Sequence, residues 1–135
     1  MDKTEREETT DYAKKKINLF LKDSEHISAL FLASIYVNIR LKTLLTNRLS
    51  PAQEKWTDTS NVIDSLYGFK KMVSLCDKLE LIPITPKTLK NLWDKRSEVA
   101  HESKLWKEDQ LPDEEIKEIT ELCNSAIDFL QKTSY

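Results

Sequence analysis

Residues 89–103 read LKNLWDKRSEVAHES, and this stretch decides how the rest of the sequence is interpreted. Thr85 and Pro86 precede it and predict a helix start, with the threonine as N-cap and the proline at the first helical position, where its missing N–H costs nothing. At 100° per residue, the apolar side chains of the stretch gather along one stripe. They are Leu89, Leu92, Trp93, Val99 and Ala100. The stretch therefore predicts an amphipathic helix that packs against the rest of the chain.

Two titratable side chains stand out in this predicted helix. Arg96 lies in the middle of the apolar stripe, where a guanidinium is costly unless another group pairs with it. His101 follows five residues later, and histidine is the side-chain type that titrates closest to neutral pH. This spacing separates them by about 7.5 Å along the helix axis and about 140° around it, so one copy of the helix would make a poor site. Two copies across a two-fold axis would bring both pairs around one cleft, and the Ser97 hydroxyl, one turn before His101, would orient the imidazole.

A short motif in this helix resembles the signature of a known superfamily. The residues from Arg96 to His101 read RSEVAH, which is similar to the R-polar-x-x-x-H signature of HEPN domains, the higher-eukaryote-and-prokaryote nucleotide-binding superfamily. The approach to the motif also fits, with LYGFKKM at 66–72 and LELI at 79–82, a pattern similar to the branch that includes mannitol-operon repressor-type proteins. The resemblance covers Leu66 to Ser103, a little over a quarter of the chain, and implies a HEPN-like helical bundle.

The resemblance implies a chemistry as well as a fold. HEPN proteins that cleave RNA do so without metal, so it implies a homodimeric endoribonuclease of the toxin or host-defence kind, with RNA as substrate and an antitoxin as a possible protein partner. His101 would act as general acid or base in the attack of a ribose 2′-hydroxyl on the adjacent phosphate. Arg96 would hold that phosphate, because a guanidinium suits two phosphate oxygens. Ser97 occupies the polar place after the arginine, where the family more often has Asn or Asp.

Two alternatives stand beside this interpretation. In the first, Arg96 pairs with a buried acid such as Asp64 or Glu25 and locks the bundle, while His101 caps the C-terminal end of its helix as a weak cation. In the second, the chain is a non-catalytic HEPN-like dimer that acts as a protein-interaction or regulatory module, since the superfamily also contains domains used only for binding.

Composition limits the remaining possibilities. The 135 residues favour a single domain spanning 1–135, and one glycine and four prolines favour an all-α, up-and-down bundle of four to five helices. The net charge of −2 gives no global attraction to nucleic acid, although residues 86–107 carry six basic against three acidic side chains. Cys76 and Cys123 lie in apolar stripes and are expected to be reduced core residues. With only two histidines and no ligand spacing, we expect no metal and no cofactor.

The expected elements can be placed along the chain. Residues 1–10 are expected to be frayed or to form the exposed start of a helix, which is clear from Tyr12 to Leu21. A second helix runs from a cap at Asp23 or Ser24 to about Asn47 and is apolar on nearly all sides. It is expected to be too short, and too interrupted by Asn38 and Arg40, to span a bilayer. A polar loop with a possible extra turn precedes a third helix at about 61–81, whose apolar stripe includes Val62, Leu66 and Phe69 and in which Gly68 suggests a close helix crossing. The last helix starts at Pro112, and the charged N-terminus, MDKTEREETT, lacks a secretory signal and favours a cytoplasmic protein.

Overall fold

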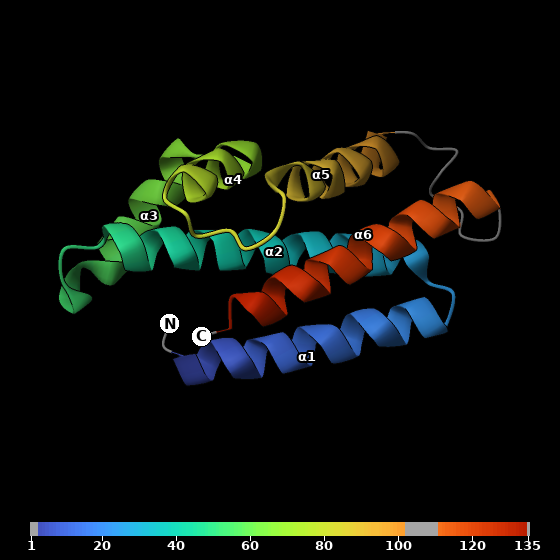
Figure 1. The fold of residues 1–135 in the computed structure, drawn as a ribbon, viewed down its shortest axis with the longest axis horizontal. Helices are drawn as coiled ribbons and strands as arrows, with labels where there is room; N and C mark the ends of the chain where they lie inside the picture. The colour runs from blue at the N-terminus through green and yellow to red at the C-terminus, as the bar shows by residue number, and fades with distance from the viewer. Residues whose placement is uncertain (1–2, 102–110, 135) are drawn as a thin grey trace.

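The computed structural model describes residues 3–101 and 111–134. Within these ranges the chain forms six α-helices and one short 3-10 helix, η1 (Figure 1). Their bounds are α1 Lys3–Lys22, α2 His26–Leu49, η1 Gln53–Lys55, α3 Trp56–Leu66, α4 Phe69–Lys78, α5 Pro86–His101 and α6 Asp113–Lys132. The fold is therefore all-α, as expected, but with more helices than the four to five predicted from the sequence.

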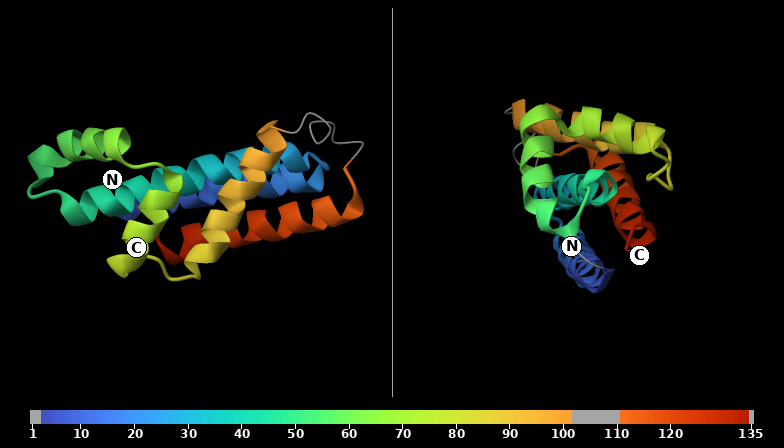
Figure 2. Two further views of the ribbon diagram at one scale, coloured as in Figure 1. Left: turned by 90° about the horizontal axis from the view of Figure 1, so that it is seen from above. Right: turned by 90° about the vertical axis from the view of Figure 1, so that its left-hand side faces the viewer.

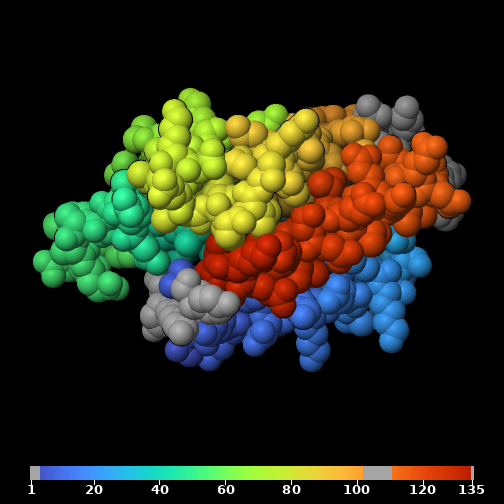
Figure 3. Space-filling view, in the orientation of Figure 1, coloured from blue at the N-terminus to red at the C-terminus, as the bar shows by residue number. Residues whose placement is uncertain are grey.

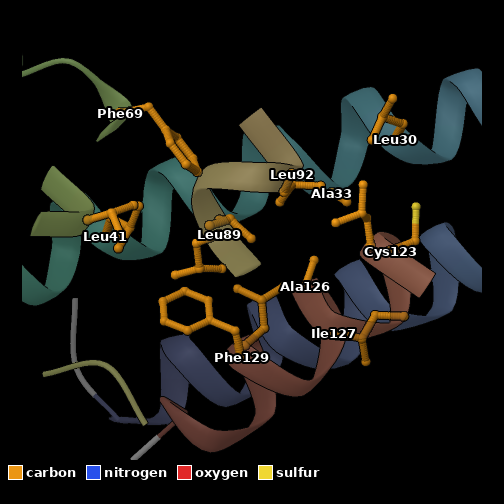
Figure 4. Close-up of a cluster of buried hydrophobic side chains, with 14 of the residues drawn as sticks. Leu30, Ala33, Leu41, Phe69, Leu89, Leu92, Cys123, Ala126, Ile127 and Phe129 are labelled. Atoms are coloured by element: carbon orange, nitrogen blue, oxygen red, sulfur yellow. The ribbon is translucent and has the colours of Figure 1, made fainter. Parts of the chain in front are cut away.

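The four longer helices α1, α2, α5 and α6 run in alternating directions along the molecule, and α5 crosses the others at an angle (Figures 1 and 2). α2 lies at the centre, because it contacts α1, α3, α4, α5 and α6. Leucines and small residues of α2 meet the inward faces of α5 and α6, where Leu89, Leu92 and Phe129 are almost completely buried (Figure 4). The apolar character of α2 thus reflects a central position in the bundle.

By length and composition alone, α2 would suffice to cross a membrane. The sequence-based expectation that it is too short and too interrupted is therefore wrong. The criterion is weak, however, because the core helix of a soluble protein passes the same test, and α2 is packed against five other helices here.

The region after α2 differs most from the sequence prediction. The extra turn in the loop is confirmed as η1, but the single helix expected at 61–81 is two helices, α3 and α4, with a break at Tyr67 and Gly68. Gly68 is the N-cap of α4 in an extended conformation, and a Cβ added there would meet nothing within 4 Å. A close helix crossing is therefore not the reason for this glycine. The break also changes the inward face of α3, where Ile63 is buried while Val62 and Leu66 are more than half exposed.

The observed helix starts agree with the predicted ones in the C-terminal half of the chain and differ from them in the N-terminal half. α5 begins at Pro86 as predicted, and α6 begins one residue after Pro112. α1 begins already at Lys3, and Thr10 is buried, so residues 3–10 form the start of a helix. α2 begins at His26 without a side-chain cap, because Ser24 adopts a left-handed conformation (φ 60°) in the turn between α1 and α2.

Candidate functional site

Arg96 is half-buried and lies against aromatic rings. Its guanidinium carbon is 4.7 Å from the ring centroid of Trp93, on the preceding turn of α5, and 5.6 Å from that of Phe31 in α2. Trp93 in turn stacks on Phe69 of α4, with 4.6 Å between the centroids. We call these three rings the aromatic shelf, and a guanidinium over such rings gains a favourable cation–π contact.

No carboxylate neutralises Arg96 in the described part of the chain. Within residues 3–101 and 111–134 this side chain forms no ion pair and donates no hydrogen bond. Asp64, one of the acids considered as a partner, instead binds Lys42 across the α2–α3 contact at 3.0 Å. The alternative in which Arg96 is paired with this acid is therefore wrong. A guanidinium carries five N–H donors, so Arg96 keeps the capacity to bind an anion.

Ser97 is half-buried and His101 is exposed as the last residue of α5. Because α5 is an uninterrupted helix between Pro86 and His101, the spacing expected from the sequence holds: about 7.5 Å along the axis and about 140° around it. The single chain therefore does not bring Arg96 and His101 together. Ser103, Lys104 and Lys107, which extend the motif and its basic region, lie outside the described residues.

Lys95 is the buried ionic residue of α5, and the sequence did not single it out. It is 5% exposed and its ammonium group contacts Glu115 at 2.7 Å and Glu118 at 2.9 Å in α6, and Glu98 at 3.4 Å in its own helix. Burial by itself lowers the pKa of Lys95, but the hydrogen bonds and charges of Glu115 and Glu118 outweigh it and raise this pKa. Lys95 thus fastens α5 to α6 and is not available to a phosphate.

The fully buried arginine is Arg40 in α2, which the sequence reasoning treated only as an interruption. It is 2% exposed, and its two terminal nitrogens donate four hydrogen bonds. The acceptors are Leu130 O at 2.8 Å, Thr133 Oγ1 at 2.9 Å, Arg6 O at 3.1 Å and Thr10 Oγ1 at 2.8 Å. Arg40 therefore joins α1, α2 and the end of α6, and none of its partners in the described part of the chain is a carboxylate. The one sequence feature that could have indicated this buried role is the position of Arg40 on an otherwise apolar helix.

An exposed apolar stripe borders the aromatic shelf. Ile35 and Ile39 of α2 are 54% and 37% exposed. They follow Phe31 at intervals of four residues, so the three side chains lie on one face of the helix. Arg96 contacts Phe31 at the end of this stripe. The candidate site is thus continuous with apolar surface that nothing in the described chain covers.

Other kinds of site have little support. Cys76 and Cys123 are buried and free, as expected, and burial raises the pKa of each thiol to about 12, which leaves almost no thiolate nucleophile at neutral pH. Within residues 3–101 and 111–134, no group of three His, Cys, Asp or Glu side chains is placed to hold a metal ion.

Comparison with protein-family models, curated proteins and solved structures finds no match to this chain. The function is therefore argued from the chain's own residues.

Proposed function

We propose that the chain is a HEPN-like, metal-independent endoribonuclease of the toxin or defence type, which acts in the cytoplasm as a homodimer with a composite active site. The observation that carries the proposal is the state of Arg96: half-buried over aromatic rings, without an ion-pair partner in the described chain, and on the same helix as the exposed His101. A guanidinium that is held in one position, with its N–H donors unused, can bind the oxygens of a phosphate.

The dimer supplies what one chain lacks. In a single chain, Arg96 and His101 face directions about 140° apart, so a second copy has to complete the site. The apolar stripe of Ile35 and Ile39 gives that copy a surface to cover, and it ends at Phe31 beneath Arg96. A two-fold contact over this stripe places two copies of Arg96 near one axis, because such a contact uses the same patch twice.

The proposed reaction is an internal transfer at phosphorus. One His101 takes the proton of the ribose 2′-hydroxyl, whose oxygen attacks the adjacent phosphorus. The bond from phosphorus to the 5′-oxygen breaks, and the second His101 returns a proton to that oxygen. Arg96 stabilises the charge that develops on the phosphate, and Ser97 orients the imidazole. The products carry a 2′,3′-cyclic phosphate and a 5′-hydroxyl, and no metal takes part.

RNA cleavage in EDTA tests this proposal. We expect the purified protein to cut tRNA or a mixed-sequence RNA and to leave 2′,3′-cyclic phosphate ends. His101→Ala and Arg96→Ala should each lower the rate about 10²–10⁴-fold, the range for a lost acid–base group or an equivalent contact to the transition state. His26→Ala, which removes the other histidine, and Lys15→Ala, which removes an exposed cation of α1, serve as matched controls and should cleave at the wild-type rate.

Intact RNA after incubation with a folded, dimeric wild-type protein would reject the nuclease. Equal cleavage by wild type and His101→Ala would show that the activity comes from a contaminant or from other residues.

One observation favours a second candidate, a non-catalytic HEPN-like dimer that serves as a protein-interaction or regulatory module. Ser97 keeps a hydroxyl but lacks the carboxamide or carboxylate that the family more often has at this place. For this candidate the apolar stripe and the aromatic shelf would bind protein, and an antitoxin or another partner would replace RNA as the ligand. It predicts a stable dimer, no RNA cleavage, and little loss of stability in His101→Ala.

A further inference from the structure

A hollow of about 440 Å³ lies far from the Arg96 site, at the end of the bundle where α2 and α6 terminate. Its walls come from the first turns of α1, the C-terminal ends of α2 and α6, and the linker between α4 and α5. Figure 3 shows the linker meeting the ends of α2 and α6 left of the centre of the molecule. The lining residues are Arg6, Leu44, Asn47, Arg48, Glu80, Leu81, Ile82, Pro83, Lys132 and Thr133. Its volume falls in the range of pockets that hold small organic ligands.

Three cationic side chains line the hollow. Arg6, Arg48 and Lys132 reach it from three different helices, and Glu80 is the acidic residue among the described residues that line it. Lys132 is also paired with Asp128, one turn earlier in α6, at 3.0 Å. Arg40 adds a fourth positive charge behind the wall, because it donates a hydrogen bond to the Thr133 hydroxyl. Cations near the ends of α2 and α6 compensate helix carbonyls, so Arg48 and Lys132 are unexceptional when taken singly.

Arg6 does not fit that explanation. It lies in the first turn of α1, where the helix dipole disfavours a positive charge. One terminal nitrogen donates only a long hydrogen bond, 3.5 Å, to Thr133 O. Its Nε is buried and has no hydrogen-bond partner in the described chain. An anionic ligand in the hollow would contact the terminal nitrogens of Arg6 and account for its charge, whereas the Nε is closed to solvent and remains an unpaired buried donor.

The hollow also has apolar lining. Leu44 of α2 and Leu81, Ile82 and Pro83 of the linker contribute this apolar wall, and a bare phosphate would leave it uncovered. We propose that the hollow binds a small phosphomonoester with an apolar or aromatic body. The phosphate lies among Arg6, Arg48 and Lys132, and the body lies against the leucine and isoleucine side chains. This binding site is independent of the ribonuclease proposal, since none of its residues belongs to the Arg96 site.

The test uses phenyl phosphate as a probe, with inorganic phosphate and phenol as its two halves. Isothermal titration calorimetry of the full chain gives the affinity, and methyl NMR shifts of Leu44, Leu81 and Ile82 locate the probe. We expect phenyl phosphate to bind more tightly than either half and to shift these methyl signals. Arg48→Gln and Lys132→Gln should each weaken binding about tenfold or more, as loss of a charge-assisted contact does. Lys14→Gln, an exposed lysine of α1, is the matched control and should bind like wild type.

The phosphate's own titration gives a second measurement. Its second pKa is about 6, so affinity should fall between pH 7.5 and pH 5.5 as the dianion becomes a monoanion. Absence of binding would overturn the proposal, as would equal affinity in wild type, Arg48→Gln and Lys132→Gln. Equal affinity for inorganic phosphate and phenyl phosphate would overturn the assignment of the apolar wall to the ligand's body. None of these results depends on whether the protein cleaves RNA.

Discussion

Arg40 and Arg96 are both arginines among apolar residues of long helices, and the fold treats them in opposite ways. Arg40 is 2% exposed and uses both terminal nitrogens in hydrogen bonds to backbone and hydroxyl oxygens. Arg96 is half-buried, lies over two aromatic rings, and has no hydrogen-bond partner in the described part of the chain. The Arg40 guanidinium uses its N–H donors within the fold, whereas the Arg96 guanidinium is held in place by the rings and its donors can bind a ligand. Apolar surroundings alone therefore do not show whether an arginine is structural or functional.

The partners of Arg40 explain how a guanidinium can be buried without a carboxylate. Its acceptors include Leu130 O and the Thr133 hydroxyl at the C-terminal end of α6, where the helix carbonyls carry partial negative charge. Burial lowers the pKa of Arg40 to about 10, and the charge of Arg6 adds to the effect. The side chain thus stays charged at neutral pH and joins α1 and α2 to the C-terminal end of α6.

The largest effect on stability is expected from Arg40→Met. This change leaves several buried oxygens without a donor, each at a cost of about 1–3 kcal/mol, so the free energy of unfolding should fall by about 3–5 kcal/mol. Urea denaturation measures it, with Arg48→Met, at an exposed position of the same helix, as the control that should change little. A loss below about 1 kcal/mol in Arg40→Met would mean that water replaces the guanidinium. Arg40 would then not be the structural arginine that the comparison with Arg96 requires.

Lys95 sharpens the comparison, because it is buried beside Arg96 but paired with carboxylates. Lys95→Met should lower the free energy of unfolding by a smaller amount, about 1–2 kcal/mol, since Glu115 and Glu118 are partly exposed and can turn to water. The folded-state pKa of Lys95 is raised, so the folded protein binds its proton more tightly than the unfolded chain does. The stabilisation is complete below the unfolded pKa of about 10.4 and is lost as pH rises through the folded pKa.

Urea titrations of wild type and Lys95→Met between pH 7 and pH 11 measure this effect. The gap between the two proteins should be constant up to about pH 10 and should shrink above it. A gap that grows with pH would contradict the assigned direction of the shift. Lys90→Met, at a half-buried position of the same helix that forms no ion pair within residues 3–101 and 111–134, is the control for loss of a lysine from α5.

Local patterns predicted the parts of the fold that depend on neighbouring residues. The start of α5 at Pro86 and the burial of Leu89, Leu92 and both cysteines followed from helical periodicity and helix-start signals. The break between α3 and α4 did not, because the apolar residues of both helices also fit one continuous stripe through Gly68. That continuous stripe placed Val62 and Leu66 in the core, whereas the real bend exposes them.

The two buried cations were harder to predict, for a physical reason. The acceptors of Arg40 are uncharged and lie 30 to 93 positions away in the sequence, so no local charge pattern indicates them. Lys95 has one acidic neighbour three residues on, but Glu115 and Glu118 come from α6. Arg96 was expected to be costly because its stripe was taken as fully buried. In the structure this position of α5 is only half-buried.

The smallest effect on stability is expected from Arg96→Ala. The side chain gives up cation–π contacts with Trp93 and Phe31, which are worth about 0.5–1 kcal/mol at partly exposed positions. Urea denaturation should therefore show a loss below about 1 kcal/mol, and Arg96→Met, which keeps apolar cover over the rings, should lose still less. A residue that contributes so little to folding, yet is held in one place by two rings, can use its donors for a ligand. A loss as large as that of Arg40→Met would instead make Arg96 a structural residue and would remove the main support for its role in binding phosphate.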